Sequence, residues 1–327
     1  MIISRTPLRI SFFGGGTDFP EFFKDEGGAV LATAIDRYSY VTASRFSSRL
    51  FDYSIRLSYR AVELAKTVGQ IEHRVFRACL EKCGLERDIE LHTVADLPSF
   101  TGLGSSSSFT VALLQALHAF KGNYVTPLAL AHQAIAIERD VLRENVGCQD
   151  QVTAAVGGFN MIEFRGDREI MVNRMPLLPA RLAELEASLF LVFTRIQRSA
   201  SQMEGRKISR LGDLKPTLRR MRSMVDEGRE ILLSAGSLAP FGELLHRAWE
   251  AKRSIEATVT NPQIDELYDR GRAAGALGGK LLGAGGGGFL LFFVPPERAV
   301  RFKDAFAEAE VIQPKLAATG AQIIFSS

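Results

Sequence analysis

The chain has 327 residues, a formal net charge of +3 at pH 7 and a hydrophobic content of 46%. This length suits two domains with ordinary cores, and so small a charge gives no reason to expect a nucleic-acid partner. No apolar run approaches the roughly 18 residues that span a bilayer, and the first residues do not resemble a secretory leader. We therefore expect a cytoplasmic protein without a membrane partner.

The first half of the sequence predicts strands and helices in alternation. Strand-rich segments run to about Ser58, and the next expected elements are a helix near 62–83, a strand at 89–94, an apolar helix at 109–120, a helix at 127–142, an apolar helix at 152–156, and strands near 159–164 and 169–173. The cysteines, Cys79, Cys83 and Cys148, are odd in number and lack paired C-x-x-C spacing, which favours reduced, buried thiols over a disulfide framework or a zinc site.

The stretch 175–179, Met-Pro-Leu-Leu-Pro, interrupts this pattern and predicts a boundary between domains 1–180 and 181–327. The second half begins with a strand at 188–194 and ends with one at 322–325. Between them we expect helices at 209–234, 241–255 and 262–274, a glycine hairpin and a further helix. The order of elements alone indicates an α+β fold.

A glycine- and serine-rich loop leads into the helix expected at 109–120. Its candidate phosphate ligands are Gly102, Leu103, Gly104, Ser105, Ser106 and Ser107. Glycines let the backbone approach a polyphosphate, and the unpaired N–H groups and dipole of the following helix favour its negative charge. The loop therefore predicts an anion site, and the alternative is a serine-capped helix after a flexible loop.

A second glycine cluster contains the pattern G-x-G-x-x-G at Gly283, Gly285 and Gly288. Strand-like runs flank it on both sides and no helix follows, so we reject a dinucleotide-binding site. A P-loop is also unlikely, because no G-x-x-x-x-G-K-[ST] occurs in the sequence. The cluster predicts a turn between buried strands, either a plain hairpin or a place where another backbone or a phosphate approaches, with Gly285 and Gly286 as candidate contacts.

A third cluster follows the alternating apolar strand near the N-terminus. Its residues are Gly14, Gly15, Gly16, Thr17 and Asp18. A strand that ends at glycines and delivers a carboxylate suits a hydroxyl-rich ligand. By itself the cluster is equally typical of a turn.

Taken together and in this order, the segments at 5–19, 98–108 and 280–289 resemble the three motifs of the GHMP kinase superfamily. The resemblance spans nearly the whole chain. It implies an ATP- and Mg²⁺-dependent kinase with an N-terminal domain like ribosomal protein S5 domain 2 and a ferredoxin-like C-terminal domain.

Within the superfamily, Gly15 and Gly16 stand where the galactokinase pattern G-E-H-T-D has the Glu and His that grip galactose. The glycines, with segments 159–164 and 245–252, look like the D-glycero-D-manno-heptose 7-phosphate kinase branch, which transfers the ATP γ-phosphoryl group to the anomeric hydroxyl. The rival interpretations are a free-sugar kinase, for fucose or another hexose, and a catalytically silent nucleotide- or sugar-binding module.

The resemblance also implies catalytic roles. Asp150 matches the aspartate of the G-x-x-D-Q motif and is expected to take the proton of the acceptor hydroxyl or to orient that hydroxyl. Arg9 matches the arginine of the first motif and is expected to lie next to Asp150 and to offset charge on the transferring phosphoryl group. Without the resemblance, Asp150 is interpreted as a helix N-cap and Arg9 as an exposed strand residue.

Two further sites follow from the resemblance. Ser106 and Glu138 match the Mg²⁺ ligands, with Ser105 interchangeable with Ser106, whereas Glu138 taken alone is typical of a solvated helix face. Arg195 and Arg198 follow an expected strand and are candidate ligands for the phosphate of the substrate, or else ordinary surface charge. The sequence does not predict an oligomeric state.

Overall fold

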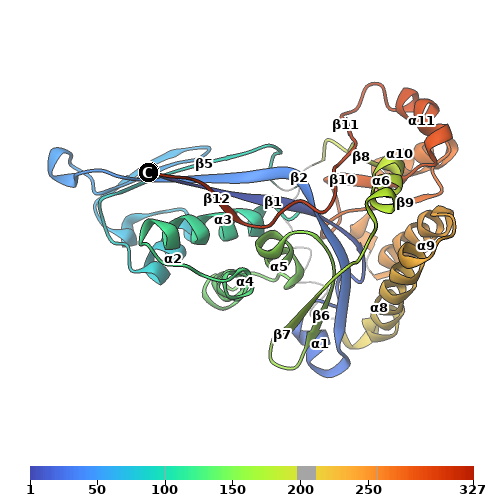
Figure 1. The fold of residues 1–327 in the computed structure, drawn as a ribbon, viewed down its shortest axis with the longest axis horizontal. Coiled ribbons are helices and arrows are strands. Elements are labelled where there is room, and N and C mark those ends of the chain that lie inside the picture. Colours follow the sequence, from blue (N-terminus) through green and yellow to red (C-terminus); the bar gives the residue numbers. More distant parts are fainter. Residues whose placement is uncertain (100, 197–210, 256) are drawn as a thin grey trace.

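The computed structural model describes residues 1–99, 101–196, 211–255 and 257–327. Figure 1 shows an elongated molecule with a long sheet and its helices at one end and a smaller sheet with its helices at the other. The mixture of helices with largely antiparallel strands is the α+β class expected from the sequence.

The large sheet carries the N-terminal glycine cluster between its two longest strands. The strands of this sheet are β1 (Ile2–Phe13), β2 (Gly28–Arg45), β3 (Ile55–Ser58), β4 (Val62–Ala65), β5 (Ile89–Ala95), β6 (Phe159–Arg165), β7 (Glu169–Arg174) and β12 (Gln322–Ser326). They pair in the order β12-β1-β2-β5-β3-β4, and β6 pairs with β2 and β7. Gly14 to Asp18 therefore lie where the chain leaves β1, just before the short helix α1 (Pro20–Glu26).

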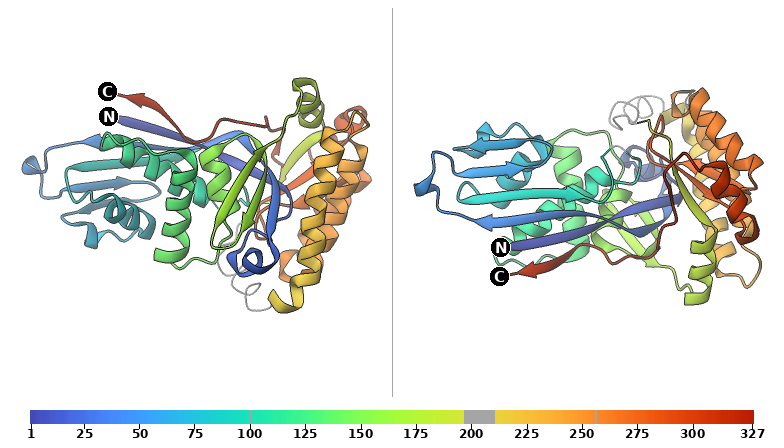
Figure 2. Two further views of the ribbon diagram at one scale, coloured as in Figure 1. Left: turned by 60° about the horizontal axis from the view of Figure 1, so that its bottom comes forward. Right: turned by 90° about the horizontal axis from the view of Figure 1, so that it is seen from above.

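Helices cover one face of the large sheet, as Figures 1 and 2 show. They are α2 (Arg74–Cys83), α3 (Ser105–Phe120), α4 (Pro127–Ile135), its π-helical continuation η3 (Ala136–Val141), and α5 (Gln149–Val156). α3 packs on β1 and β2 and buries apolar side chains such as Val111 and Leu114. This packing fixes the N-terminus of α3 beside β1.

The smaller sheet has the strand order β11-β8-β10-β9. Its strands are β8 (Leu189–Phe193), β9 (Gly278–Leu281), β10 (Phe289–Phe293) and β11 (Val311–Ile312), and its helices are α6 (Pro179–Ser188), α8 (Leu211–Leu233), α9 (Ala239–Ile255), α10 (Pro262–Ala273) and α11 (Ala299–Ala305). Single turns of 3₁₀-helix occur at η1 (Ser48–Leu50), η2 (Val68–Gln70), η4 (Ala257–Val259) and η5 (Pro296–Arg298). β10 is apolar and buried along its whole length, so it is covered on both faces.

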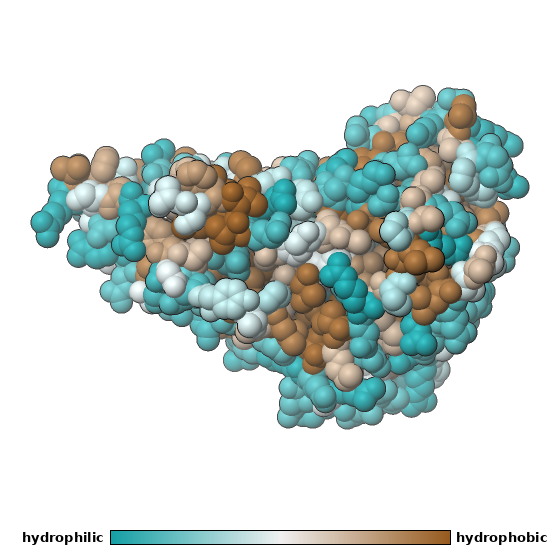
Figure 3. All heavy atoms as spheres, viewed as in Figure 1, coloured by the Kyte–Doolittle hydropathy of each residue, from teal (hydrophilic) through white to brown (hydrophobic). Residues whose placement is uncertain are grey.

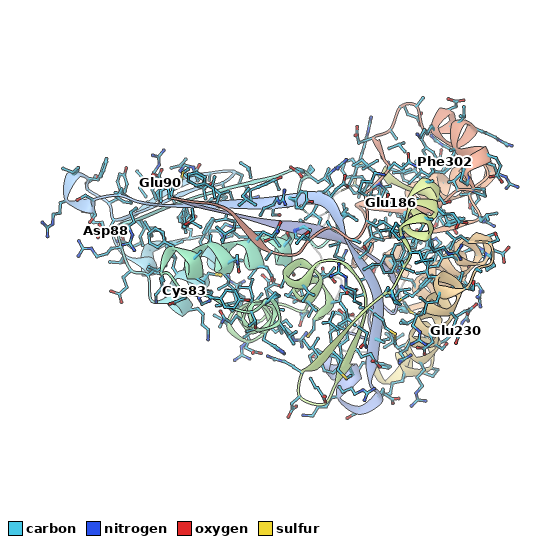
Figure 4. All side chains as sticks on the ribbon, viewed as in Figure 1. Cys83, Asp88, Glu90, Glu186, Glu230 and Phe302 are labelled. Carbon is cyan, nitrogen blue, oxygen red and sulfur yellow. The ribbon has the colours of Figure 1, made fainter. Side chains whose placement is uncertain are left out.

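After β11 the chain returns to the large sheet. Glu186, labelled on α6 in Figure 4, accepts hydrogen bonds from the backbone N of Leu316 at 2.7 Å and from Lys315 Nζ at 3.0 Å. β12 then pairs with β1, and Figure 2 shows the two termini side by side. The last strand thus crosses the division expected after residue 180, which stays a prediction.

The structure corrects one expected element and adds another. The helix expected at 62–83 begins only at Arg74, because residues 62–65 alternate their side chains as β4 and pair with β3. The added element is α6, which is not predicted from the sequence: Pro179 is its first residue, and Pro20 likewise begins α1. Proline suits this position because the N–H that it lacks would have no partner within the helix.

The surface is mixed in polarity. Hydrophilic side chains cover most of the face in Figure 3, and apolar groups gather in separate patches. Among the described residues, none of the helices combines the length and the apolar character that crossing a membrane requires.

Candidate active site

The glycine- and serine-rich loop presents the N-terminus of α3 to solvent. Gly102 and Gly104 adopt φ values of 78° and 74°, a region that favours glycine. In the described part of the chain, no side chain caps this helix, so the N–H groups of Ser105, Ser106 and Ser107 are available to a ligand. The geometry is that of an anion cradle.

The C-terminal glycine cluster packs directly on this loop. A Cβ atom on Gly283 would lie 2.6 Å from Gly102 Cα, and one on Gly288 would lie 2.3 Å from Thr101 O. The backbone N of Phe289 also donates to Thr101 O at 3.0 Å. These glycines therefore form a hairpin whose backbone supports the phosphate loop, one of the two outcomes expected from the sequence.

Gly285 and Gly286, in the same hairpin, contact Val259 instead of the phosphate loop. The backbone N of Gly286 donates to Val259 O at 2.9 Å, and a Cβ atom on Gly285 would lie 2.9 Å from Val259 Cα. Their expected contact with the substrate stays a prediction.

Arg9 joins the phosphate loop to Asp150. Its Nε and Nη2 atoms each donate to an Asp150 carboxylate oxygen at 2.7 Å, and Nη1 donates to Gly102 O at 2.6 Å. The Arg9 side chain is buried, whereas that of Asp150 is 24% exposed. A Cβ atom on Gly104 would lie 3.2 Å from Asp150 Oδ2, so the carboxylate stands directly beside the anion cradle. Arg9 is therefore not the exposed strand residue that the bare sequence suggests.

Glu138 lies on the π-helical turn η3 and is almost completely buried. Its Oε2 atom accepts from Ser107 Oγ at 2.8 Å and from Gln151 Nε2 at 2.6 Å, while Oε1 has no hydrogen-bond partner among the described residues. Burial raises the pKa of this carboxyl to about 7, against the effect of its hydrogen bonds. The solvated-face interpretation of Glu138 is wrong.

The environment of Glu138 suits a hard dication. An orphaned carboxylate oxygen in a buried site is a group that awaits a partner, and Mg²⁺ takes one or two protein oxygens besides substrate phosphates and waters. The described residues contain no cluster of three or more His, Cys, Asp or Glu that would favour another metal. Ser107, expected from the sequence only as a phosphate ligand, is the hydroxyl that contacts Glu138, while Ser106 is exposed and keeps its metal role as a prediction.

The N-terminal glycine cluster is tied to the loop that carries Asp150. Asp18 is buried and accepts hydrogen bonds from the backbone N of Gly16 at 3.0 Å and of Gln149 at 3.2 Å. Thr17 is buried too, and its hydroxyl donates to Gly14 O at 2.8 Å. Both side chains therefore hold the backbone of the surrounding loops in place. Their expected contact with a hydroxyl-rich ligand stays a prediction.

Of the two arginines expected to bind a substrate phosphate, the structure describes only Arg195. Arg195 Nη2 donates to Glu308 O at 2.6 Å, beyond the end of α11. Arg198 lies outside the described residues. The phosphate role of this pair stays a prediction.

Lys280 is a functional candidate that the motif analysis does not single out. It is buried in β9, and its Nζ donates to Ser11 O at 3.1 Å and to Phe12 O at 2.8 Å. Burial, with the nearby Arg9 charge, lowers its pKa to about 7. A single lysine within an apolar strand was the available signal, because a buried amine needs partners.

Comparison with known proteins agrees with this geometry. Residues 70–158 match the GHMP kinases N terminal domain, and residues 229–312 match the GHMP kinases C terminal domain. The D-glycero-alpha-D-manno-heptose 7-phosphate kinase of Campylobacter jejuni is 33% identical over 313 residues, which are 91% of this chain and 90% of that protein.

Solved structures share the fold along its whole length. The crystal structure of a D-glycero-D-manno-heptose 1-phosphate kinase from Bacteriodes thetaiotaomicron has a TM-score of 0.82 at 25% identity and covers 100% of both chains. Lactococcus lactis galactokinase, solved with galactose, has a TM-score of 0.77 at 18% identity and covers 98% of this chain and 94% of that one. These matches confirm the expected two-part α+β fold, with its S5 domain 2-like and ferredoxin-like halves. The chain belongs to the GHMP kinase superfamily and is an ATP-dependent phosphotransferase.

Proposed function

We propose that this kinase transfers the γ-phosphoryl group of ATP to the anomeric C1 hydroxyl of D-glycero-D-manno-heptose 7-phosphate, with Mg²⁺ as cofactor. The observation that carries the proposal is the contact between the anion cradle and the Asp150–Arg9 pair at Gly104. Phosphoryl transfer requires positioned phosphates, neutralised charge and an aimed hydroxyl, and this arrangement offers a group for each task. The choice of sugar rests on the Campylobacter jejuni relative.

Asp150 is the group that faces the acceptor. With one oxygen beside Gly104 and two bonds from Arg9, its carboxylate is fixed in orientation and still partly open to solvent. A carboxylate so placed accepts the proton of the hydroxyl or orients that hydroxyl toward the γ-phosphorus. The Arg9 guanidinium, held at the loop carbonyl of Gly102, lies where charge develops on the transferring group.

The phosphates of ATP bind at Gly102 to Ser107, and Glu138 with Ser106 or Ser107 holds the metal. A Mg²⁺ ion held there would supply charge neutralisation for the phosphates. The Ser107–Glu138 bond sets the carboxylate at the first turn of α3, beside the cradle. Gln151 fixes the same oxygen from α5, so Oε1 is left for the cation.

A free-sugar kinase is the second candidate, and one observation favours it. Arg195, half of the expected phosphate anchor, is already engaged by Glu308 O. If the acceptor carries a phosphate and Arg198 binds it, Arg198→Ala should lower kcat/KM for the sugar phosphate by about tenfold to 150-fold through loss of a charge-assisted bond. The same variant should scarcely affect the unphosphorylated sugar, whereas equal losses reject Arg198 as the anchor.

The test of the proposal is an acceptor panel. The purified protein, with ATP and Mg²⁺, is given D-glycero-D-manno-heptose 7-phosphate, the free heptose, fucose, galactose and mannose, and ADP release is followed. The heptose phosphate should show the highest kcat/KM, and the product should carry its new phosphate at C1. A preference for a free sugar would reject the heptose 7-phosphate assignment and leave the kinase assignment intact.

A further inference from the structure

Two buried polar atoms, one on β1 and one beside Asp150 in the chain, make no hydrogen bond with any of the described residues. Ser11, on β1, is 6% exposed, and its Oγ has no hydrogen-bond partner among the described residues. Gln149, the first residue of α5, has a buried Oε1 in the same condition. An unmade bond to a buried polar atom costs free energy, so each of these atoms calls for a partner that the described residues do not supply.

The two side chains border one space, and Gly15 forms its third wall. A Cβ atom built on Gly15 would lie 3.8 Å from Gln149 Nε2 and 3.9 Å from Ser11 Oγ, with no other heavy atom among its nearest neighbours within 4 Å. The neighbouring glycines do not offer such room: a Cβ atom on Gly14 would lie 1.9 Å from Ala29 O, and one on Gly16 would lie 3.1 Å from Leu218. The open position is therefore specific to Gly15.

This space adjoins the catalytic pair residue by residue. Ser11 follows Arg9 by two positions on β1, and side chains so related share one face of a strand, about 6.6 to 6.8 Å apart. Gln149 immediately precedes Asp150 in the first turn of α5. Ser11 thus lies on the same strand face as Arg9, and Gln149 is the chain neighbour of Asp150.

The chemistry of the pair selects a hydroxyl. A serine hydroxyl both donates and accepts, and a glutamine amide offers one accepting oxygen and two N–H donors. Neither group carries charge, so the pair does not favour a phosphate or an ammonium group over a neutral ligand. A sugar hydroxyl can donate to Gln149 Oε1 and accept from Ser11, which satisfies both orphaned atoms.

We propose that Ser11, Gln149 and the bare backbone of Gly15 form a subsite that binds a second hydroxyl of the sugar whose reacting hydroxyl is aimed by Asp150. This inference rests on the proposal that the acceptor is a sugar, and it is independent of whether that sugar carries a phosphate. The subsite determines which sugar is accepted, because it binds a sugar that carries a hydroxyl at one particular ring position. The missing side chain of Gly15 leaves room for that hydroxyl.

Three variants test the subsite: Ser11→Ala, Gln149→Leu and Gly15→Ala. Each should lower kcat/KM for the sugar by about three- to tenfold, the effect of one neutral hydrogen bond, mainly through a higher KM and with the KM for ATP unchanged. None should lower Tm, because Ser11→Ala removes a hydroxyl without a partner and Gly15 has an ordinary φ and space for a methyl group. A fall in Tm that parallels the loss of activity would overturn the proposal in favour of a structural role.

Matched controls exist in the same chain. Thr6→Val removes another buried hydroxyl of β1 that has no partner among the described residues, and Gly69→Ala adds a methyl group where nothing lies within 4 Å. Both controls should leave kcat/KM for the sugar unchanged.

Monodeoxy analogues give the direct measurement. One analogue should lose about three- to tenfold in kcat/KM with the wild-type enzyme and lose nothing further with the double variant Ser11→Ala/Gln149→Leu, because both bonds to that hydroxyl are then already missing. If every analogue loses as much with the double variant as with the wild type, the two atoms serve an ordered water and the proposal is rejected. The series uses heptose 7-phosphate or, should that substrate fail, the best free sugar of the panel, so failure of the substrate assignment is distinguishable from failure of the subsite.

Discussion

Two carboxylates flank the anion cradle, and the protein treats them in opposite ways. Asp150 is partly exposed, and both of its oxygens are bonded to the Arg9 guanidinium. Glu138 is buried, the donors around it are the neutral groups of Thr110, Ser107 and Gln151, and its Oε1 makes no hydrogen bond among the described residues. Asp150, whose charge is balanced by Arg9, is suited to act on the neutral hydroxyl of the acceptor. Glu138, to which no cationic side chain is bonded in the described part of the chain, is suited to bind a metal cation such as Mg²⁺.

The largest expected effect concerns Asp150, the carboxylate that is bonded to Arg9. Asp150→Asn keeps the size of the side chain but removes its ability to accept a proton, so kcat should fall by about 10² to 10⁴. The affinity for ATP should change little, because the cradle consists of backbone N–H groups and serine hydroxyls. Steady-state kinetics with both substrates measures this difference.

Asp140→Asn is the matched control for that variant. Asp140 also binds an arginine through both oxygens, Arg168, but its side chain is 47% exposed and lies on η3 rather than at the cradle. Its substitution should leave kcat unchanged. Near-wild-type turnover of Asp150→Asn with a stable fold would remove Asp150 from the mechanism.

The second effect concerns the carboxylate without a cation. Glu138→Gln should raise the Mg²⁺ concentration needed for half-maximal activity by about tenfold or more, the loss that is usual even for groups around the ligands of a metal. A Mg²⁺ titration of initial rates at saturating ATP measures it. An unchanged titration would assign the metal to other groups.

The same substitution should stabilise the metal-free protein. Because the pKa of Glu138 is raised to about 7 from an ordinary value of 4.5, the folded chain binds this proton more tightly than the unfolded chain. Stability is therefore lost as pH rises from 4.5 through 7, by up to about 3 kcal/mol, and glutamine avoids that loss. Chemical denaturation at pH 8 without Mg²⁺ should show Glu138→Gln to be the more stable protein, and the difference should vanish near pH 4.5.

A third effect is competition between protons and the metal. Mg²⁺ binds the deprotonated carboxylate, so its apparent affinity should fall by about tenfold for each pH unit below 7. In Glu138→Gln the affinity should be nearly independent of pH. Calorimetric titration of the protein with Mg²⁺ in the presence of ADP, between pH 5.5 and 8, separates the two cases.

The sequence predicts the parts of the site that depend on short motifs. The cradle at Gly102 to Ser107 and the pairing of Arg9 with Asp150 follow from local patterns and from the family resemblance. The burial of Glu138 does not follow from such patterns, because Glu-Arg-Asp on a helix is typical of a solvated face. Its environment is completed by α3 and α5, which bring Ser107 and Gln151, 31 and 13 residues away in the chain, into contact with it.

The same limit applies to the unpaired Ser11 and to Lys280. Alternation along β1 shows that Ser11 shares a face with Arg9, but whether its hydroxyl finds a partner depends on α5. Lys280 is recognisable as a lone charge in an apolar strand, and its partners, the carbonyls of Ser11 and Phe12, come from the other end of the chain. Long-range partners of this kind leave no local signal.

Lys280 is a buried amine that can be compared with the buried carboxyl of Glu138. Its substitution should have the smallest of the expected effects, a change in stability that depends on pH. Its pKa is lowered to about 7 from 10.5, so the unfolded chain binds more protons between these values and stability rises with pH across that window, opposite in sign to Glu138. Lys280→Met removes two bonds to carbonyls of β1 and should cost about 1 to 3 kcal/mol at pH 9, but less at pH 6, where wild type carries a buried charge. Denaturation of this variant and of the exposed control Lys82→Met at both pH values measures the difference. A cost that is equal at pH 6 and pH 9 would show that the amine keeps one charge state throughout, and would remove the opposition in sign between Lys280 and Glu138.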